Sequence, residues 1–327
     1  MTILAVVATE IAHQPARAAE PLPELESRFT RATPPTPQEV HGPGEPILSD
    51  NFDANGDGSN DAVVIAPSSD PSGVGRVVIV STATDEVLWQ FSAEQTGDVI
   101  PIAATAGDVN DDGLDDVIIT IMRWNETTEM MDSWVDVRSG VDGALLFNLQ
   151  SPAVITDGFG VSVAAAGDVD GDGHDDIIVG APLGGKQVTG RAYVFSGLDG
   201  ALLRTVHNFG PGAMLGASVA GLGDIDGDGN ADYIVGAPAD EQSLGFARAY
   251  SGATGALLRS FTATEPGGEF GRNVAALGDI TGDGVAEVVV TEPAIVLDAD
   301  ASGAPLRQGR VHVYSGADGL SLATLEG

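Results

Sequence analysis

The sequence predicts an all-β protein, a β-propeller made of four-stranded antiparallel blades with five blades visible. Three observations predict it. An acidic nine-residue stretch recurs five times at intervals of 55 to 60 residues, and a fixed period of this length is typical of repeat architectures. Each repeat holds four short β-type segments separated by Gly-, Asp- and Ser-rich turns. No segment shows a sustained helical period with caps at both ends.

The N-terminal residues precede the repeats and differ from them in composition. Residues 1–20 contain an apolar run at 3–8 and Ala-Arg-Ala-Ala at 16–19, which resemble the end of a secretory signal peptide. Glu10 shortens the apolar run and no basic residue precedes it, so we expect a degraded or mis-started signal. Residues 21–44 are rich in Pro and Glu and predict a flexible linker. The propeller then covers residues 45–327.

The third repeat shows the strand pattern most clearly. We expect its strands near 160–166, 176–180, 190–196 and 201–206, and the other repeats follow by analogy. The second segment of each repeat is apolar at nearly every position, which is typical of a strand covered on both faces. Representative positions are Val63, Val64, Val117, Ile118, Ile177, Ile178, Ile234 and Val289.

A longer motif runs through the same repeats. An aromatic–glycine pair such as Phe159-Gly160 stands nine residues before the acidic stretch, which in the third repeat reads GDVDGDGHDDIIVGAP together with its flanks. This order resembles the FG-GAP repeat of the integrin α-subunit propeller and its bacterial relatives. The resemblance covers roughly residues 45–327, although the first, second and fifth repeats lack parts of the Gly-Ala-Pro ending.

The resemblance implies an extracellular, calcium-binding propeller, and propellers of this family usually have seven blades. Five repeats are present here. A closed five-bladed ring and a fragment of a seven-bladed ring both fit that number. Five complete four-strand units with no strand left over slightly favour the ring.

The acidic stretches predict metal sites. Ca²⁺ binds six to eight oxygen atoms, and each stretch offers side-chain oxygens at positions 1, 3, 5 and 9 with a glycine at position 6 for a sharp turn. Simple Asp-Gly hairpin turns are the alternative, but packing several carboxylates into nine residues five times is costly without a cation. We therefore expect up to five Ca²⁺ ions. The candidate ligands are Asp53, Asn55, Asp57, Asp61, Asp108, Asn110, Asp112, Asp116, Asp168, Asp170, Asp172, Asp176, Asp224, Asp226, Asp228, Asp232, Asp279, Thr281, Asp283 and Glu287.

The five loops differ in charge, and charge tunes calcium affinity. The loops that begin at Asp168 and Asp224 carry four carboxylates at the ligand positions, so we rank them tightest. The loop that begins at Asp279 has Thr281 at position 3, so we rank it weakest. His174 occupies position 7, where only the backbone carbonyl would bind, and we expect its side chain to face solvent.

Composition excludes several functions. The formal net charge of −34 disfavours binding to nucleic acid or to anionic lipid, because both are themselves negatively charged. The chain has no cysteine, which excludes disulfides, cysteine–zinc sites and thiol catalysis. We find no motif of a catalytic site, so we expect a protein that is not an enzyme.

The remaining candidate is a binding surface. Arg123 and Trp124 lie in a connection between the second and third strands of the second repeat, and an exposed Trp beside an Arg is typical of recognition sites. Packing of Trp124 onto a neighbouring blade is the alternative. We expect a secreted or cell-surface binding or adhesion module that takes a protein or glycan ligand on the face opposite the calcium loops. The alternative function is an accessory propeller of, or a scaffold for, a secreted polysaccharide-active enzyme.

Overall fold

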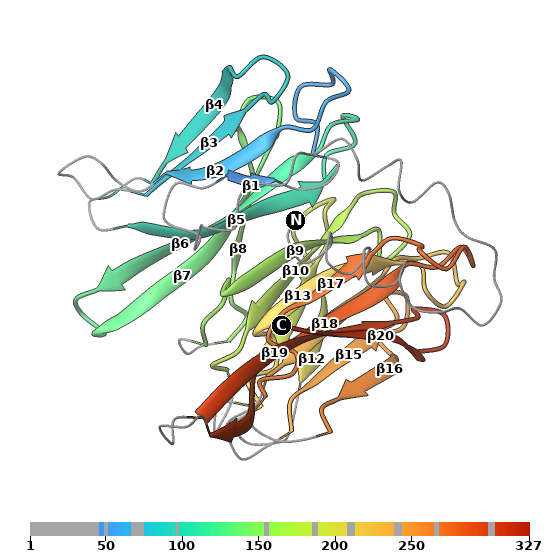
Figure 1. Ribbon diagram of the computed structural model, residues 1–327. Coiled ribbons are helices and arrows are strands. Elements are labelled where there is room, and N and C mark those ends of the chain that lie inside the picture. The colour runs from blue at the N-terminus through green and yellow to red at the C-terminus, as the bar shows by residue number, and fades with distance from the viewer. Residues whose placement is uncertain are drawn as a thin grey trace.

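The computed structural model describes residues 46–48, 52–66, 75–93, 95, 98–153, 157–184, 189–207, 213–238, 244–264, 268–299 and 305–327. These residues form five four-stranded sheets (Figure 1). Within each sheet, consecutive strands pair antiparallel. The predicted signal segment and linker lie outside the described residues. The predicted all-β architecture of four-stranded blades is confirmed.

Each sheet consists of four consecutive strands in chain order. The strands are β1 (Pro46–Leu48), β2 (Ala62–Ala66), β3 (Arg76–Val80) and β4 (Val87–Ser92); β5 (Val99–Gly107), β6 (Asp116–Asn125), β7 (Met130–Arg138) and β8 (Leu145–Gln150); β9 (Ser162–Gly167), β10 (Asp176–Ala181), β11 (Arg191–Phe195) and β12 (Leu202–His207); β13 (Ser218–Gly223), β14 (Asp232–Ala237), β15 (Phe246–Tyr250) and β16 (Leu257–Thr262); β17 (Val274–Leu277), β18 (Glu287–Ala299), β19 (Pro305–Tyr314) and β20 (Ser321–Glu326).

The antiparallel order fixes which connections share an end of the molecule. The connections from first to second strand and from third to fourth strand of each sheet lie at one end, which we call the loop end. The hairpins from second to third strand lie at the other, which we call the hairpin end. The long hairpin strands β6 and β7 extend outward at the hairpin end (Figure 1).

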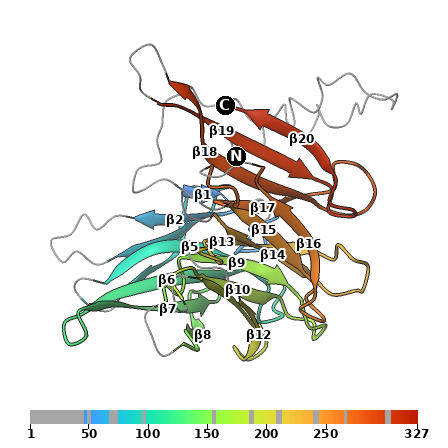
Figure 2. The same cartoon turned by 90° about the horizontal axis from the view of Figure 1, so that it is seen from below.

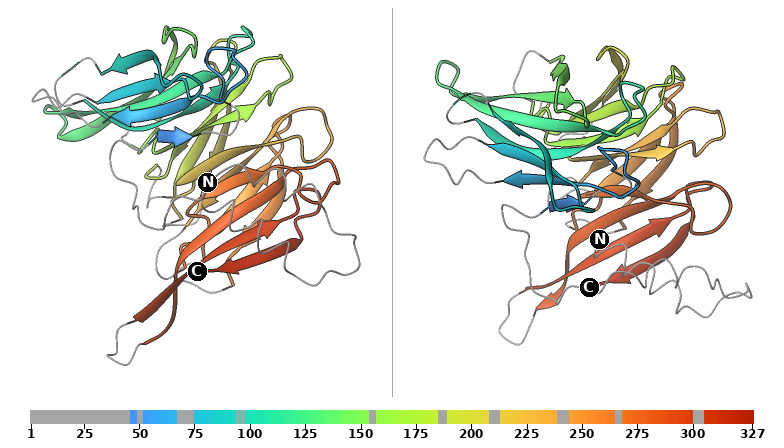
Figure 3. Two further views of the ribbon diagram at one scale, coloured as in Figure 1. Left: turned by 45° about the horizontal axis from the view of Figure 1, so that its top comes forward. Right: turned by 90° about the horizontal axis from the view of Figure 1, so that it is seen from above.

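Hydrophobic clusters join the sheets in sequence. One cluster lies between the second and third sheets and contains Ile118 and Val137 from one and Ile177 and Tyr193 from the other. Similar clusters join the first to the second sheet, the third to the fourth and the fourth to the fifth. The sheets therefore stack as twisted blades that fan out around a common region (Figure 3).

The second strands together contribute more residues to these clusters than the first, third or fourth strands. The positions expected to be covered on both faces are buried, except for Val64, which is half-buried. Val64 points to the face of the first sheet that turns away from the second sheet, since its neighbour Val63 belongs to the cluster between those two sheets. The exception therefore marks the end of the series of blades.

Two glycines have a steric role at the boundary between the third and fourth sheets. Gly216 has a φ of 88°, which favours glycine, and its carbonyl accepts a hydrogen bond of 2.9 Å from the Ser162 hydroxyl of the preceding sheet. A Cβ atom on Gly180 would lie 2.0 Å from the same carbonyl oxygen. The glycine of the Gly-Ala-Pro ending thus gives the next blade room to approach.

The first and fifth sheets are the ends of the series. Figure 1 shows the first sheet at the top and the fifth at the bottom, and Figure 2 shows β18, β19 and β20 at one side of the molecule. Among the described residues, no hydrophobic cluster contains residues of both sheets; the last cluster, around Val289 and Val313, contains the fifth sheet alone. The slight preference for a closed five-membered ring of equal interfaces is therefore not supported. Within the same residues, no helix has the length and apolar character needed to cross a membrane.

Candidate metal sites

All five acidic stretches fold into loops at the loop end, between the first and second strands of each sheet. The glycine at position 6 adopts the left-handed conformation in every loop, with φ between 83° and 94°. A side chain there would be strained, so the sequence requirement for glycine is a backbone requirement. The predicted sharp turn at position 6 is confirmed.

The aspartate at position 1 organises the loop that follows it. Both carboxylate oxygens of Asp168 accept backbone hydrogen bonds, Oδ1 from Gly171 at 2.7 Å and Oδ2 from Gly173 at 2.9 Å. Asp224 and Asp279 make the same pair of contacts in their own loops. The carboxylate at position 1 therefore holds the backbone of the loop in a closed turn.

The carboxylate at position 9 is buried at the base of each loop. Asp176 accepts hydrogen bonds from the backbone amides of Val169 and Gly197, both at 2.8 Å. Burial, with a smaller contribution from nearby loop carboxylates, raises the pKa of Asp116 and Asp176 to about 7 and that of Asp232 to about 6. Within the described residues, no arginine forms an ion pair with these carboxylates.

Buried oxygens without partners point to the missing positive charge. Among the described residues, Asp61 Oδ1, Asn110 Oδ1 and Glu287 Oε1 are buried and accept no hydrogen bond. Each belongs to a different loop and occupies position 3 or 9, where a metal ligand was predicted. Because an unsatisfied buried oxygen is destabilising, these atoms fit a bound cation better than they fit a simple turn.

Three of the loops gather acidic side chains closely enough to share one ion. The ligand oxygens in each group lie within 4.8 Å of one another. The groups are Asp168, Asp170 and Asp176; Asp224, Asp226 and Asp232; and Asp279, Asp283 and Glu287. Asp172 and Asp228 are outside these groups, and each instead accepts a backbone hydrogen bond two residues along.

The first two loops differ at position 3, where both carry asparagine. In the second loop the Asn110 amide nitrogen donates to Asp116 Oδ1 at 3.3 Å. The first two loops form no such group of three acidic side chains among the described residues. Asn55 and Asn110 therefore lower the density of negative charge there. The fifth loop, ranked weakest from its sequence, does gather three acidic side chains, so the grouping differs from that ranking for this loop.

Neighbouring loops also touch one another, which the sequence analysis missed. His174 does not face solvent as expected; its Nδ1 lies 2.9 Å from the Val109 carbonyl oxygen of the preceding loop. Asp175, at position 8, accepts a hydrogen bond of 3.1 Å from the backbone amide of Asp108. The only sequence signal for this contact is the Asp-Asp pair that ends the second and third loops.

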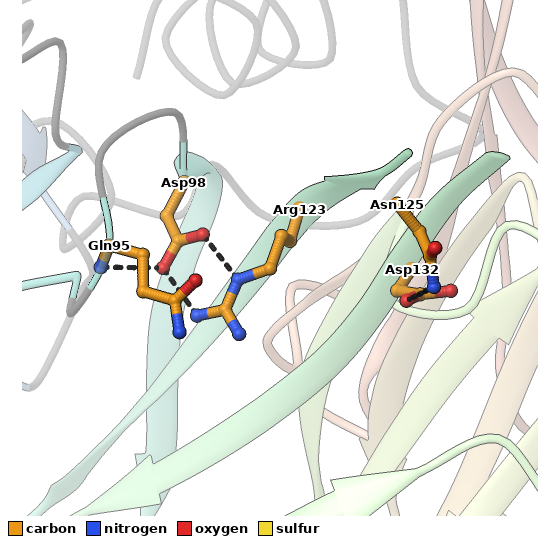
Figure 4. Close-up of polar contacts among 5 residues, drawn as sticks. All are labelled: Gln95, Asp98, Arg123, Asn125 and Asp132. Atoms are coloured by element: carbon orange, nitrogen blue, oxygen red, sulfur yellow. Dashed lines mark hydrogen bonds and ion pairs between the residues drawn. The ribbon is translucent and has the colours of Figure 1, made fainter. Parts of the chain in front are cut away.

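At the hairpin end, Arg123 is engaged within the fold. Its guanidinium group contacts both oxygens of the buried Asp98 carboxylate, at 2.7 and 2.8 Å, and Figure 4 shows this pairing beside Gln95. The ion pair lowers the pKa of Asp98. The guanidinium also lies 4.9 Å from the centre of the Trp134 ring. Arg123 thus anchors β6 to the start of β5.

Trp124 lies on the opposite face of the same hairpin and is 54% exposed. It pairs across the hairpin with Met131, and Val99 on β5 is exposed on the same face. The tip is ordered by Asn125, which donates to Asp132 at 2.7 Å (Figure 4). Of the two alternatives for Trp124, exposure rather than packing on a neighbouring blade is the one observed.

A scan against protein families matches the FG-GAP repeat at residues 159–195. This segment contains the Phe-Gly pair, the acidic loop and the Gly-Ala-Pro ending of the third sheet.

Curated relatives are integrin α subunits. Integrin alpha-5 of Xenopus laevis is 32% identical over 55% of this chain and 18% of its own length. Integrin alpha pat-2 of Caenorhabditis briggsae is 32% identical over 57% of this chain and 17% of its own length. The matched part of the chain therefore spans less than a fifth of these relatives.

A solved structure, described as an exotype rhamnogalacturonan lyase YesX, is also similar. It is 13% identical, covers 74% of this chain and 53% of its own, and superposes with a TM-score of 0.37.

Proposed function

Since this chain carries the FG-GAP repeat and has integrin α subunits among its relatives, we propose that it is a calcium-stabilised, non-catalytic binding module that works outside the cell. The observation that supports it most is the buried position-9 carboxylate at the base of the loops, surrounded by further carboxylates and without a cationic side chain. A divalent cation would supply the missing charge at each loop. The carboxylate and carbonyl oxygens would hold it, and its role would be structural.

The donor set favours Ca²⁺ over other metals. All predicted ligands are oxygen atoms, which excludes the nitrogen and sulfur sites typical of zinc and copper. Ca²⁺ accepts irregular oxygen geometry, whereas Mg²⁺ demands a near-ideal octahedron and keeps several waters. Loops of nine residues that differ at positions 3 and 9 are easier to reconcile with Ca²⁺. Extracellular calcium modules work with dissociation constants of about 0.1 to 1 mM, which fits the proposed location.

Calcium removal tests this proposal. A ligand that binds only the folded protein stabilises it by about 2.7 kcal/mol per site at a hundredfold excess over its dissociation constant. The melting temperature should rise with added Ca²⁺, fall in excess chelator and respond much less to Mg²⁺. An unchanged melting temperature between calcium and chelator would exclude calcium as the stabilising ion.

The proposed ligand surface is the hairpin face that carries Trp124. The hairpin is held in place by the ion pair between Arg123 and Asp98, so Trp124 is presented on a rigid element. A flat, exposed aromatic ring on such an element is typical of protein–protein hot spots, and its apolar face with a polar N–H also suits a glycan. A protein or glycan ligand is therefore proposed at the end opposite the calcium loops.

Ligand capture with a matched variant tests the surface. Immobilised protein is probed with a glycan array and a panel of extracellular proteins, as wild type, Trp124→Ala and Leu257→Ala. Leu257 is comparably exposed at the loop end, so it controls for the loss of any exposed apolar side chain. Binding should fall at least tenfold only in Trp124→Ala. Equal binding by all three proteins would place the ligand elsewhere, and release of sugars from a polysaccharide panel would overturn the non-catalytic assignment.

A further inference from the structure

Two aspartates outside the predicted ligand set link one loop to the next. Asp175 belongs to the third loop, but its Oδ2 accepts a hydrogen bond of 3.1 Å from the backbone amide of Asp108 in the second loop. Asp115 belongs to the second loop, and its Oδ2 accepts one of 3.3 Å from the backbone amide of Asp53 in the first. The two residues that donate these hydrogen bonds, Asp108 and Asp53, both occupy position 1, the position that organises the loop.

The contact around Asp108 has two halves. The Asp175 backbone amide donates to the Asp108 carbonyl oxygen at 3.1 Å, while the Asp175 carboxylate accepts from the Asp108 amide. The carboxylate also fills the space beside Gly107, where a Cβ atom would lie 2.0 Å from Asp175 Oδ2. Asp108 is therefore held on both its backbone groups by a single residue of the next blade.

The fourth sheet provides a natural comparison. Its loop has Ala231 at position 8, and the Ala231 amide still donates to the Asp168 carbonyl oxygen at 2.8 Å. The backbone half of the contact is thus present without the carboxylate half. An alanine at position 8 is compatible with the fold, so the carboxylates of Asp115 and Asp175 are not needed to form the blade boundary.

We propose that Asp115 and Asp175 are positioning residues that set the calcium affinity of the preceding loop, across the blade boundary, rather than that of their own. The inference rests on the proposed calcium binding. Asp175 fixes the position-1 ligand Asp108 in its binding orientation, and Asp115 does the same for Asp53. The first and second loops, which carry asparagine at position 3, gain this support. The third loop, which is followed by Ala231, does not.

Calorimetric titration of the calcium-depleted full chain with Ca²⁺ tests the inference. Asp175→Ala should weaken one site by about tenfold, as expected for loss of a hydrogen bond to a charged group. Asp175→Asn keeps an oxygen acceptor for the Asp108 amide and should recover most of the affinity. Asp199→Ala, which removes an exposed carboxylate from the same sheet, should leave every site unchanged.

Double variants identify the affected loop. Asp112→Ala disables the second loop, and in that background Asp175→Ala should have no further effect on calcium binding. Asp170→Ala removes a carboxylate from the acidic group of the third loop, and in that background the tenfold loss should persist.

Three results would overturn the inference. These are an effect that follows the third loop instead of the second, an asparagine variant as weak as the alanine variant, and an unchanged titration in Asp175→Ala. An absence of calcium binding by the wild type would overturn the proposed function as well, so the two failures are distinguishable.

Discussion

Asp116 and Asp176 are carboxylates that the fold buries before any metal is considered. Their pKa is raised to about 7 by burial, against about 3.9 in an unfolded chain. A raised acid pKa means that the folded state holds a proton which the unfolded chain has lost. The contribution of these groups to the free energy of unfolding is therefore fully present below about pH 4 and is lost as the pH rises to about 7.

This gives a pH prediction for the calcium-depleted protein. As the pH is raised from 5 to 7.5, its urea midpoint should decrease. The free energy of unfolding should decrease by at most about 1.4 kcal/mol per pH unit for each group. Saturating Ca²⁺ should flatten the dependence, because the cation stabilises the ionised carboxylate. Asp176→Asn, which cannot ionise, should reduce the slope without calcium. A stability that rises with pH in the depleted wild type would contradict the assigned burial.

The side chain at position 3 should rank the sites. Asp170→Thr gives the third loop the residue of the fifth, and Thr281→Asp gives the fifth loop the residue of the third. Because each carboxylate strengthens a calcium site, the first change should weaken one site in a calorimetric titration and the second should strengthen one. Opposite or equal effects would show that carboxylate number does not order these sites.

The blade boundary is decided at the scale of the strand. The second strands of the third and fourth sheets place a glycine, Gly180 and Gly236, where the next sheet's Leu-Gly or Phe-Gly pair comes close, and the preceding apolar residues fill the clusters between sheets. The same strand thus needs bulk at one position and the absence of a side chain at the next. That combination is why its sequence ends in a glycine after a β-branched run.

Gly180→Ala tests this arrangement. The new Cβ atom would lie 2.0 Å from the Gly216 carbonyl oxygen, so one of the two sheets must shift, at a cost of about 1 to 3 kcal/mol or more. Gly309→Ala, on β19, is the matched control, since the nearest atoms to its new Cβ would be those of Pro293, 3.7 Å away. Chemical denaturation should separate the two variants clearly; similar stabilities would mean that the sheets are not closely apposed at Gly180.

At the scale of the whole molecule, the first and fifth sheets differ from the three between them. Ile177 and Ile178 of the third sheet point to opposite faces, and each belongs to a cluster shared with a neighbouring sheet. In the fifth sheet, Val290 belongs to the cluster shared with the fourth sheet, whereas Val289 belongs to a cluster of the fifth sheet alone.

Paired alanine substitutions should reveal this asymmetry. Ile177→Ala and Ile178→Ala should destabilise the protein equally, by about 2 to 5 kcal/mol each. Val290→Ala should cost more than Val289→Ala, because fewer atoms of a second sheet surround Val289. Equal losses for the two valines, measured in calcium, would indicate that a further sheet packs on the fifth and closes the ring.

The sequence by itself determined the repeat, the strands and the loops. The third-sheet strands fall within two residues of their expected positions, because alternating burial and turn glycines act over a few neighbouring residues. The acidic loops were equally readable, since one loop supplies its own ligands. Only the tertiary structure decided how distant residues meet: Asp175 contacts Asp108, 67 residues away, and Arg123 pairs with Asp98. Such contacts depend on how one blade is set against the next, and the packing of whole sheets fixes that, not the local pattern of any one repeat.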